Sequence, residues 1–285
     1  MLSAGIGLAA PPAVADIQFT VQDREVARMV SLGGSCNRCE LSGRNLAGAT
    51  FTGATFVAAT LVEANLRGAE LVGSNFSGSD FSRADLRGVQ IQGSNFSNSN
   101  FTDAVLTGAE AQGANFNRAN LTNANLSGAE LVGANMSGAV LTRANLAGAE
   151  LFGSTLANLS ARGASFAGAE LNAANMAGGD FASANFSGAE LDGARLQGAT
   201  FRGASFTDAS LRRTDIRGAD LSGARGLTQS QVSEACGDGG TRLPGRLTVR
   251  SCSGRSPLRI APPRAPVPPV PPSPRRNFAS GNGGR

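Results

Sequence analysis

Apolar residues recur at every fifth position through the middle of the chain, from Leu41 to Leu221, without a slip in register. A small residue, mostly Ala or Ser, lies two positions before each large one, and Gly often lies two positions after it. This period fits neither an α-helix, with about 3.6 residues per turn, nor a strand, with about two. It predicts a coil that turns a corner once per pentapeptide, with large and small residues inside and Gly at the corner.

A second period of 20 residues predicts four sides to each coil. The tripeptide Gly-Ala-Glu recurs at this spacing from 68–70 to 188–190, with Gly88-Val89-Gln90 filling one place. Side chains 20 positions apart should therefore stack on one another. The residues expected to form the core include Leu46, Phe56, Leu66, Phe76, Leu86, Phe96, Leu106, Phe116, Leu126 and Met136.

The same period predicts a column of stacked carboxylates on one outer face. Its members are Glu70, Glu110, Glu130, Glu150, Glu170 and Glu190. Like charges about 5 Å apart repel one another, so a function would explain their presence, and the column is the candidate interaction stripe. The alternative is a solvated stripe, tolerated after duplication of the repeat unit, because exposed charges couple weakly in water.

The pentapeptides, such as Ala124-Asn125-Leu126-Ser127-Gly128, follow the pattern A(D/N)LXX, and in this the chain resembles the pentapeptide-repeat family over residues 41–225, with Cys36 as an alternative starting point. The resemblance implies an all-β fold, a right-handed quadrilateral β-helix. About nine coils, each rising ~4.8 Å, would form it. Some members of the family protect DNA gyrase by mimicking DNA with a strongly acidic β-helix.

The segments on either side of the repeat differ from it in composition. Ala13-Val14-Ala15 fits a signal-peptidase site, although the basic residues that begin a signal peptide are missing, and an Ala-rich leader is the alternative. After the repeat, Thr228 and Gln231 form a capping-box pattern that predicts a helix over about 229–236. The expected organisation is a truncated signal peptide at 1–15, an N-terminal cap at 16–40, the β-helix at 41–225, a C-terminal cap at 226–252, and a disordered Pro/Arg-rich tail at 253–285.

Four cysteines lie just outside the repeat, Cys36 and Cys39 before it and Cys236 and Cys252 after it. A zinc site with four thiolate ligands is one possibility. In a β-helix of the implied length, however, the two pairs lie too far apart to share one ion. Two local disulfides are therefore expected, each closing one cap, and they favour an oxidising compartment. The redox-motif interpretation of Cys36-Asn37-Arg38-Cys39 lacks the surrounding βαβ pattern.

The composition argues against catalysis. The chain has no His, and all 25 of its positive charges are Arg. Without His, Ser and Cys lack their commonest activating base, and without Lys there is no Schiff-base chemistry. The many carboxylates repeat identically, with no cleft to separate their pKa values. We therefore expect no enzyme activity, no catalytic residue, no cofactor and no bound metal.

The charge distribution limits the partners. The repeat carries 13 Arg and 15 acidic residues, whereas residues 226–285 carry nine Arg and two acidic residues. The basic tail could contact an anionic surface, but its only aromatic residue is Phe278, so no specific nucleic acid is expected. No apolar run reaches the ~18 residues of a membrane helix.

These patterns predict a non-catalytic scaffold exported to the bacterial envelope, periplasmic or secreted, that binds an unidentified protein or envelope component. The alternative is a cytoplasmic, DNA-mimicking, gyrase-binding protein. The nearly neutral repeat argues against this alternative, and the glutamate column argues for it. The oligomeric state stays open between a monomer and a dimer formed through a cap.

Overall fold

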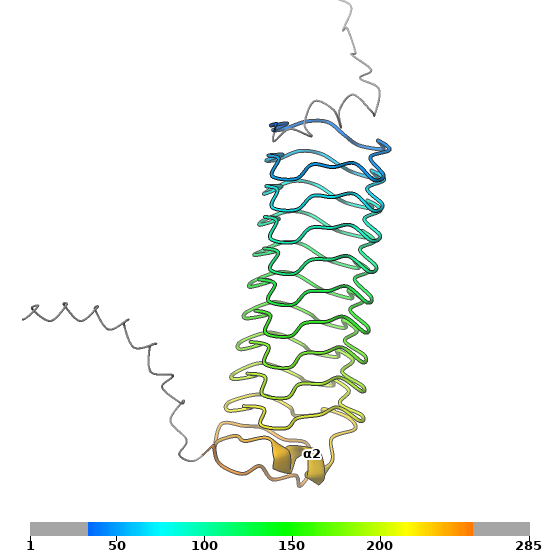
Figure 1. The fold of residues 1–285 in the computed structure, drawn as a ribbon. Coiled ribbons are helices and arrows are strands. Elements are labelled where there is room, and N and C mark those ends of the chain that lie inside the picture. The colour runs from blue at the N-terminus through cyan, green and yellow to red at the C-terminus, as the bar shows by residue number, and fades with distance from the viewer. Residues whose placement is uncertain (1–33, 253–285) are drawn as a thin grey trace, which may run out of the picture. The chain divides into compact units, whose positions relative to one another are not determined.

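The computed structural model describes residues 34–252, and through them the chain winds into a stack of four-sided coils (Figure 1). Each pentapeptide contributes one residue to a parallel bridge with the coils before and after it, as Asn75 does with Thr55 and Asn95. The Phe76 N–H donates to the Asn95 carbonyl at 2.8 Å, and the Asn95 N–H donates to the Ser74 carbonyl at 2.8 Å. The fold is the all-β, right-handed quadrilateral β-helix that the family resemblance implies.

Each corner is a two-residue turn whose second residue has a positive φ. At many corners this residue is Gly, for example Gly148 with φ 64°, where the missing Cβ makes the left-handed conformation accessible. Other corners place an ordinary side chain in the same conformation, such as Ala173 with φ 59°. The coil geometry imposes this φ on the second residue of every corner, and the packed interior stabilises the side-chain-bearing residues that are strained there.

The large residues at every fifth position, with few exceptions, fill the interior together with the small residues that precede them. All ten residues expected in the core are at most 2% exposed. In one coil the large and the small residue are exchanged. Leu159 occupies a position usually held by Ala or Ser, Ala161 occupies one usually held by Leu or Phe, and both are buried. The interior therefore keeps its volume where the repeat departs from its own consensus, as close packing requires.

Phenylalanine rings stack in columns along the interior. Phe76 and Phe96 are parallel at 5.5 Å between ring centroids, and Phe81 packs edge-on against Phe76 at 5.4 Å. A second group lies in the later coils, where Phe186 stacks on Phe166 at 5.0 Å. Aliphatic residues such as Leu126 and Met136 separate the two groups.

The coil geometry begins earlier than the boundary expected at residue 41. Ser35 and Glu40 already form parallel bridges, with Thr55 and Thr60, so part of the expected N-terminal cap belongs to the first coil. The expected signal peptide (1–15) and the Pro/Arg-rich tail (253–285) lie outside the described residues.

A short helix and a loop cover the last coil. Helix α2, Gln229–Glu234, begins with the predicted capping box, which Thr228 and Gln231 form (Figure 1). It ends before the predicted boundary at 236, because Ala235 is extended (φ −86°, ψ 173°) and Cys236 bridges to Asp215. Pairing with the stack thus overrides the local helical pattern. Among the described residues, no helix has the length and hydrophobicity to span a membrane.

Candidate functional site

The outer faces of the β-helix differ in how their polar side chains are satisfied. On one face the amides bond to each other, as Asn95 Nδ2 donates to Asn75 Oδ1 at 3.2 Å and Asn115 Nδ2 donates to Asn95 Oδ1 at 3.1 Å. Their oxygens also accept from backbone N–H groups two residues on, such as that of Ser97. A face built in this way leaves few polar groups for a partner.

A second face, called here the glutamate face, carries the predicted carboxylate column. Parallel bridges join Glu110 to Glu130 and continue coil by coil to Glu190, whereas Gln90 separates this run from Glu70. The structure thus brings the predicted residues together in one column. Neighbouring members lie one coil apart, about 4.8 Å along the stack.

Some of these carboxylates accept a hydrogen bond from a side chain in the preceding coil. Gln92 donates to Glu110 at 2.7 Å, Gln112 donates to Glu130, and Asn172 donates to Glu190 at 2.9 Å. Thr50 reaches Glu70 at 3.4 Å. Within 34–252, Glu150 and Glu170 have no side-chain partner, because the residues in the donor positions for them are Val132 and Phe152.

Arginine neutralises many acidic residues elsewhere, but within 34–252 it forms no ion pair with the glutamate column. The ion pairs include Asp85–Arg87, Asp180–Arg162, Asp192–Arg212, Asp215–Arg217, Asp220–Arg202 and Glu63–Arg83. A hydrogen bond from Ser222, opposed by burial and reinforced by Arg202, lowers the pKa of Asp220 to about 2. The glutamate column is therefore a continuous row of acidic side chains that, within the described residues, forms no ion pair.

One aromatic side chain beside this column is exposed. Phe152 is 55% exposed, and Val140, on another face, is the one other large hydrophobic residue exposed within the described range. The sequence analysis did not single out Phe152, because it considered the large residues at every fifth position and Phe152 is not one of them. The available signal was its register, since it occupies an outward, usually polar position directly after the buried Leu151.

Both ends of the described unit carry a disulfide. Cys36 is joined to Cys39, and Cys236 is joined to Cys252, with Cα–Cα distances of 5.4 and 4.8 Å. No free cysteine occurs among the residues that the structure describes. The half-buried Cys36 and Cys39 pack against the hydrophobic core, so the N-terminal pair lies at the end of the interior.

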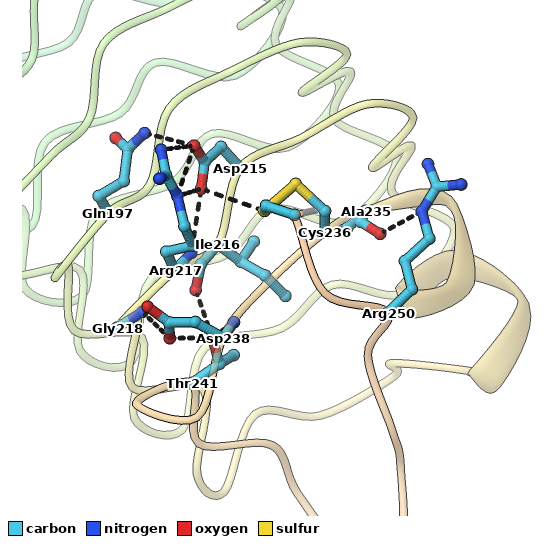
Figure 2. Close-up of a disulfide and its surroundings, with 11 residues drawn as sticks. Gln197, Asp215, Ile216, Arg217, Gly218, Ala235, Cys236, Asp238, Thr241 and Arg250 are labelled. Atoms are coloured by element: carbon cyan, nitrogen blue, oxygen red, sulfur yellow. Dashed lines mark hydrogen bonds and ion pairs between the residues drawn. A yellow bond between two sulfur atoms is a disulfide. The ribbon is translucent and has the colours of Figure 1, made fainter. Parts of the chain in front are cut away.

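The C-terminal disulfide lies against the last coil, as Figure 2 shows. The Cys252 Sγ is 3.8 Å from Asp215 Oδ1, and that carboxylate accepts hydrogen bonds from Arg217 and Gln197. Asp215 and the two sulfurs lie within 4.8 Å of one another, a spacing that could suit a metal ion. The sulfurs are bonded to each other, however, so neither is a thiolate that could bind a metal.

Side chains of the C-terminal cap satisfy the backbone of the last coils. Gln231 Nε2 donates to the carbonyls of Phe206 and Ala209 at 2.9 and 2.8 Å. Thr241 Oγ1 donates to the Ile216 carbonyl at 3.0 Å, and Asp238 accepts from the Gly218 N–H at 2.9 Å (Figure 2). Gln231 also lines a hollow beside α2, but its amide nitrogen already donates to a backbone carbonyl of the stack and is not free to bind a ligand.

The repeat itself is found in other proteins. The family model for pentapeptide repeats matches the chain repeatedly, and its matches include 35–71, 59–98, 84–123, 99–138, 119–158, 149–189 and 189–225. No curated protein is significantly similar to the chain in sequence.

Similar solved structures include HetL, a pentapeptide repeat protein involved in heterocyst differentiation regulation from the cyanobacterium Nostoc sp. strain PCC 7120. It is 29% identical over 77% of this chain and 96% of its own, with a TM-score of 0.41. The plasmid-mediated fluoroquinolone resistance protein QnrB1 is 19% identical over 74% of this chain and 92% of its own, with a TM-score of 0.39. Because the family model matches well over half of its residues, the chain belongs to the pentapeptide-repeat family.

Proposed function

We propose that this protein is a non-catalytic, protein-binding scaffold that is exported to the bacterial envelope or beyond. The observation that carries the proposal is the pairing of Cys36 with Cys39 and of Cys236 with Cys252. Disulfides persist in oxidising compartments, whereas cytosolic thiols are kept reduced. A chain with a disulfide at each end of its β-helix suits the periplasm or the extracellular space.

The composition of the chain and the state of its described cysteines support the scaffold part of the proposal. Leu, Phe and Ala fill the interior of the described unit, and the chain contains no His. No described cysteine is free to act as a nucleophile. The function then depends on the outer faces, which display side chains at the regular spacing of the coils.

The intact mass of the natively expressed protein, measured without reductant, tests the export. We expect a chain that starts at Asp16 and lacks four thiol hydrogens. The same sample, reduced and alkylated, should gain four alkyl groups and serves as the control. A chain that keeps residues 1–15 and has four free thiols would contradict the export and place the protein in the cytoplasm.

The glutamate column favours a second candidate, a cytoplasmic, DNA-mimicking protein that binds gyrase. Stacked carboxylates such as Glu110, Glu130 and Glu150 present negative charge at regular intervals, as a nucleic-acid backbone does. A DNA supercoiling assay with purified gyrase tests it. We expect inhibition that weakens when these residues are changed to Gln, and an unaffected enzyme would exclude this candidate.

A further inference from the structure

We propose that an arginine side chain of a partner protein docks at the centre of the glutamate face, on Glu150, Phe152 and Glu170. These three residues are called here the Phe152 patch. The inference deepens the proposed scaffold function and rests on it, because it names the surface and the chemistry of the partner. It arises from the one place where the carboxylate column and an exposed aromatic ring meet.

Two neighbouring carboxylates of the column, those of Glu150 and Glu170, are available to a partner. Glu150 and Glu170 are paired by a parallel bridge and are both exposed. Amides at equivalent positions reach the other members of the column from Glu110 onward, as Gln92 does with Glu110 at 2.7 Å. Val132 and Phe152 replace those amides at the centre, so Glu150 and Glu170 lack a donor among the described residues. They therefore present two free acceptors one coil apart.

The aromatic ring of Phe152 is exposed beside one of these carboxylates. By the register that places Asn172 within 2.9 Å of Glu190, Phe152 lies beside Glu170. Its ring is 55% exposed; Val132 and Asn172 occupy the equivalent positions one coil away on either side, and the second residues of these three corners are small, namely Gly133, Gly153 and Ala173. A Cβ added to Gly133 or to Gly153 would meet nothing within 4 Å. A side chain from outside can thus reach the face of the ring.

An arginine side chain fits both the pair of carboxylates and the exposed ring. A guanidinium group is planar, donates to carboxylates through two parallel N–H groups, and stacks on aromatic faces. A lysine ammonium supplies the charge without the planar stacking, so the patch should prefer Arg to Lys. Within 34–252 no arginine forms an ion pair with Glu150 or Glu170, so the described part of the chain leaves these two carboxylates open to a partner. Nucleic acid is disfavoured, because its phosphates would approach an uncompensated row of carboxylates.

Fluorescence anisotropy with two labelled nonapeptides, one of arginine and one of lysine, tests the proposal on the full-length protein. We expect the wild type to bind the arginine peptide about three- to fivefold more tightly than the lysine peptide. Phe152→Ala should abolish this preference. The double variant Glu150→Gln/Glu170→Gln should weaken binding of both peptides about tenfold. Equal affinity of the wild type for the two peptides would overturn the proposal.

A control variant separates the patch from general charge. Glu40→Gln/Asp103→Asn also removes two negative charges, but from exposed positions outside the glutamate face. It should change the affinity for either peptide less than twofold. If it weakens binding as much as Glu150→Gln/Glu170→Gln does, the interaction is non-specific and the proposal is wrong. All the altered side chains are exposed, so thermal midpoints should stay near that of the wild type, and circular dichroism verifies folding.

Sedimentation tests whether a second copy of the chain occupies the patch, and the intact mass tests whether the protein is exported. If sedimentation shows a dimer that Glu150→Gln/Glu170→Gln dissociates, the face is occupied by a second copy, and the proposal of a foreign partner falls. The intact mass tests export independently of peptide binding. Disulfides with no arginine preference would overturn this inference alone, whereas free thiols with the full preference would overturn export and leave the patch in place.

Discussion

The β-helical stack and its C-terminal cap are held together in different ways. In the stack, each coil repeats the contacts of the previous one, so that Phe96 bonds to Asn115 as Phe76 bonds to Asn95. In the cap, each contact occurs once, such as the bonds from Gln231 to the Phe206 and Ala209 carbonyls. The stack is periodic because each coil needs only its neighbours, whereas the cap must match one particular end.

This difference shows what a periodic fold lacks. A coil without a following coil exposes backbone acceptors, and such an edge can pair with another chain. The Gln231 side chain covers one of these acceptors, the Ala209 carbonyl, and the Cys236–Cys252 disulfide holds the covering loop in place. Variants in the stack should therefore disrupt several coils together, while variants in the cap should act at one end.

The largest effect is expected from a charge in the interior of the stack. Leu126→Arg places an uncompensated cation at a position that is 1% exposed, and it should lower the free energy of unfolding by about 3–5 kcal/mol. Urea denaturation followed by circular dichroism measures the loss. Leu126→Met, which nearly conserves volume, should cost less than about 1.5 kcal/mol. Wild-type stability in Leu126→Arg would show that the register is wrong.

Removal of the C-terminal disulfide should affect the cap more than the stack. Cys236→Ser/Cys252→Ser opens a link with a sequence separation of 16 and should lower stability by about 3 kcal/mol. Hydrogen exchange should rise at Val232 and stay slow at Phe116. The matched variant Cys36→Ser/Cys39→Ser opens a separation of only three and should cost less, because a shorter loop loses less entropy. Equal losses in the two variants would contradict this explanation.

Acid should weaken the contact between the stack and the cap. Asp220 accepts a hydrogen bond from Ser222 and pairs with Arg202, and these contacts, opposed by burial, lower its pKa to about 2; Arg242 in the cap lies 3.8 Å from the same carboxylate. Because the pKa is lower in the folded state, the stabilisation is present above about pH 4 and is lost as the pH falls toward 2. Wild type should lose about 1–2 kcal/mol more than Asp220→Asn between pH 5 and pH 2. Identical pH profiles of unfolding would remove Asp220 from this role.

The smallest effect is expected at the corners of the stack. Ala173→Gly relieves a left-handed conformation at φ 59° and should raise stability by about 1 kcal/mol. Gly148→Ala imposes that conformation on a side chain and should lower stability by about as much, since a Cβ there meets nothing within 4 Å. The midpoint of thermal unfolding should therefore rise in Ala173→Gly and fall in Gly148→Ala. A loss of stability in Ala173→Gly would mean that chain entropy outweighs the strain.

The sequence alone determined the interior and the register of the carboxylate column. A period of five places one residue of each pentapeptide inside, and a period of 20 aligns Glu130 with Glu150, because in a four-sided coil sequence spacing translates directly into position. The capping box at Thr228 and Gln231 was also predictable, because its hydrogen bonds join residues close in sequence.

Tertiary structure decided the features that depend on contacts between coils. Helix α2 ends at Glu234 because Cys236 pairs with Asp215, a residue from the preceding coil. Phe152 is exposed because its position points outward, although its residue type favours burial. Within the described part of the chain, Glu150 and Glu170 lack side-chain donors because Val132 and Phe152 lie in the donor positions of the previous coils. A periodic sequence determines which positions meet, but the particular side chains at those positions determine which bonds form.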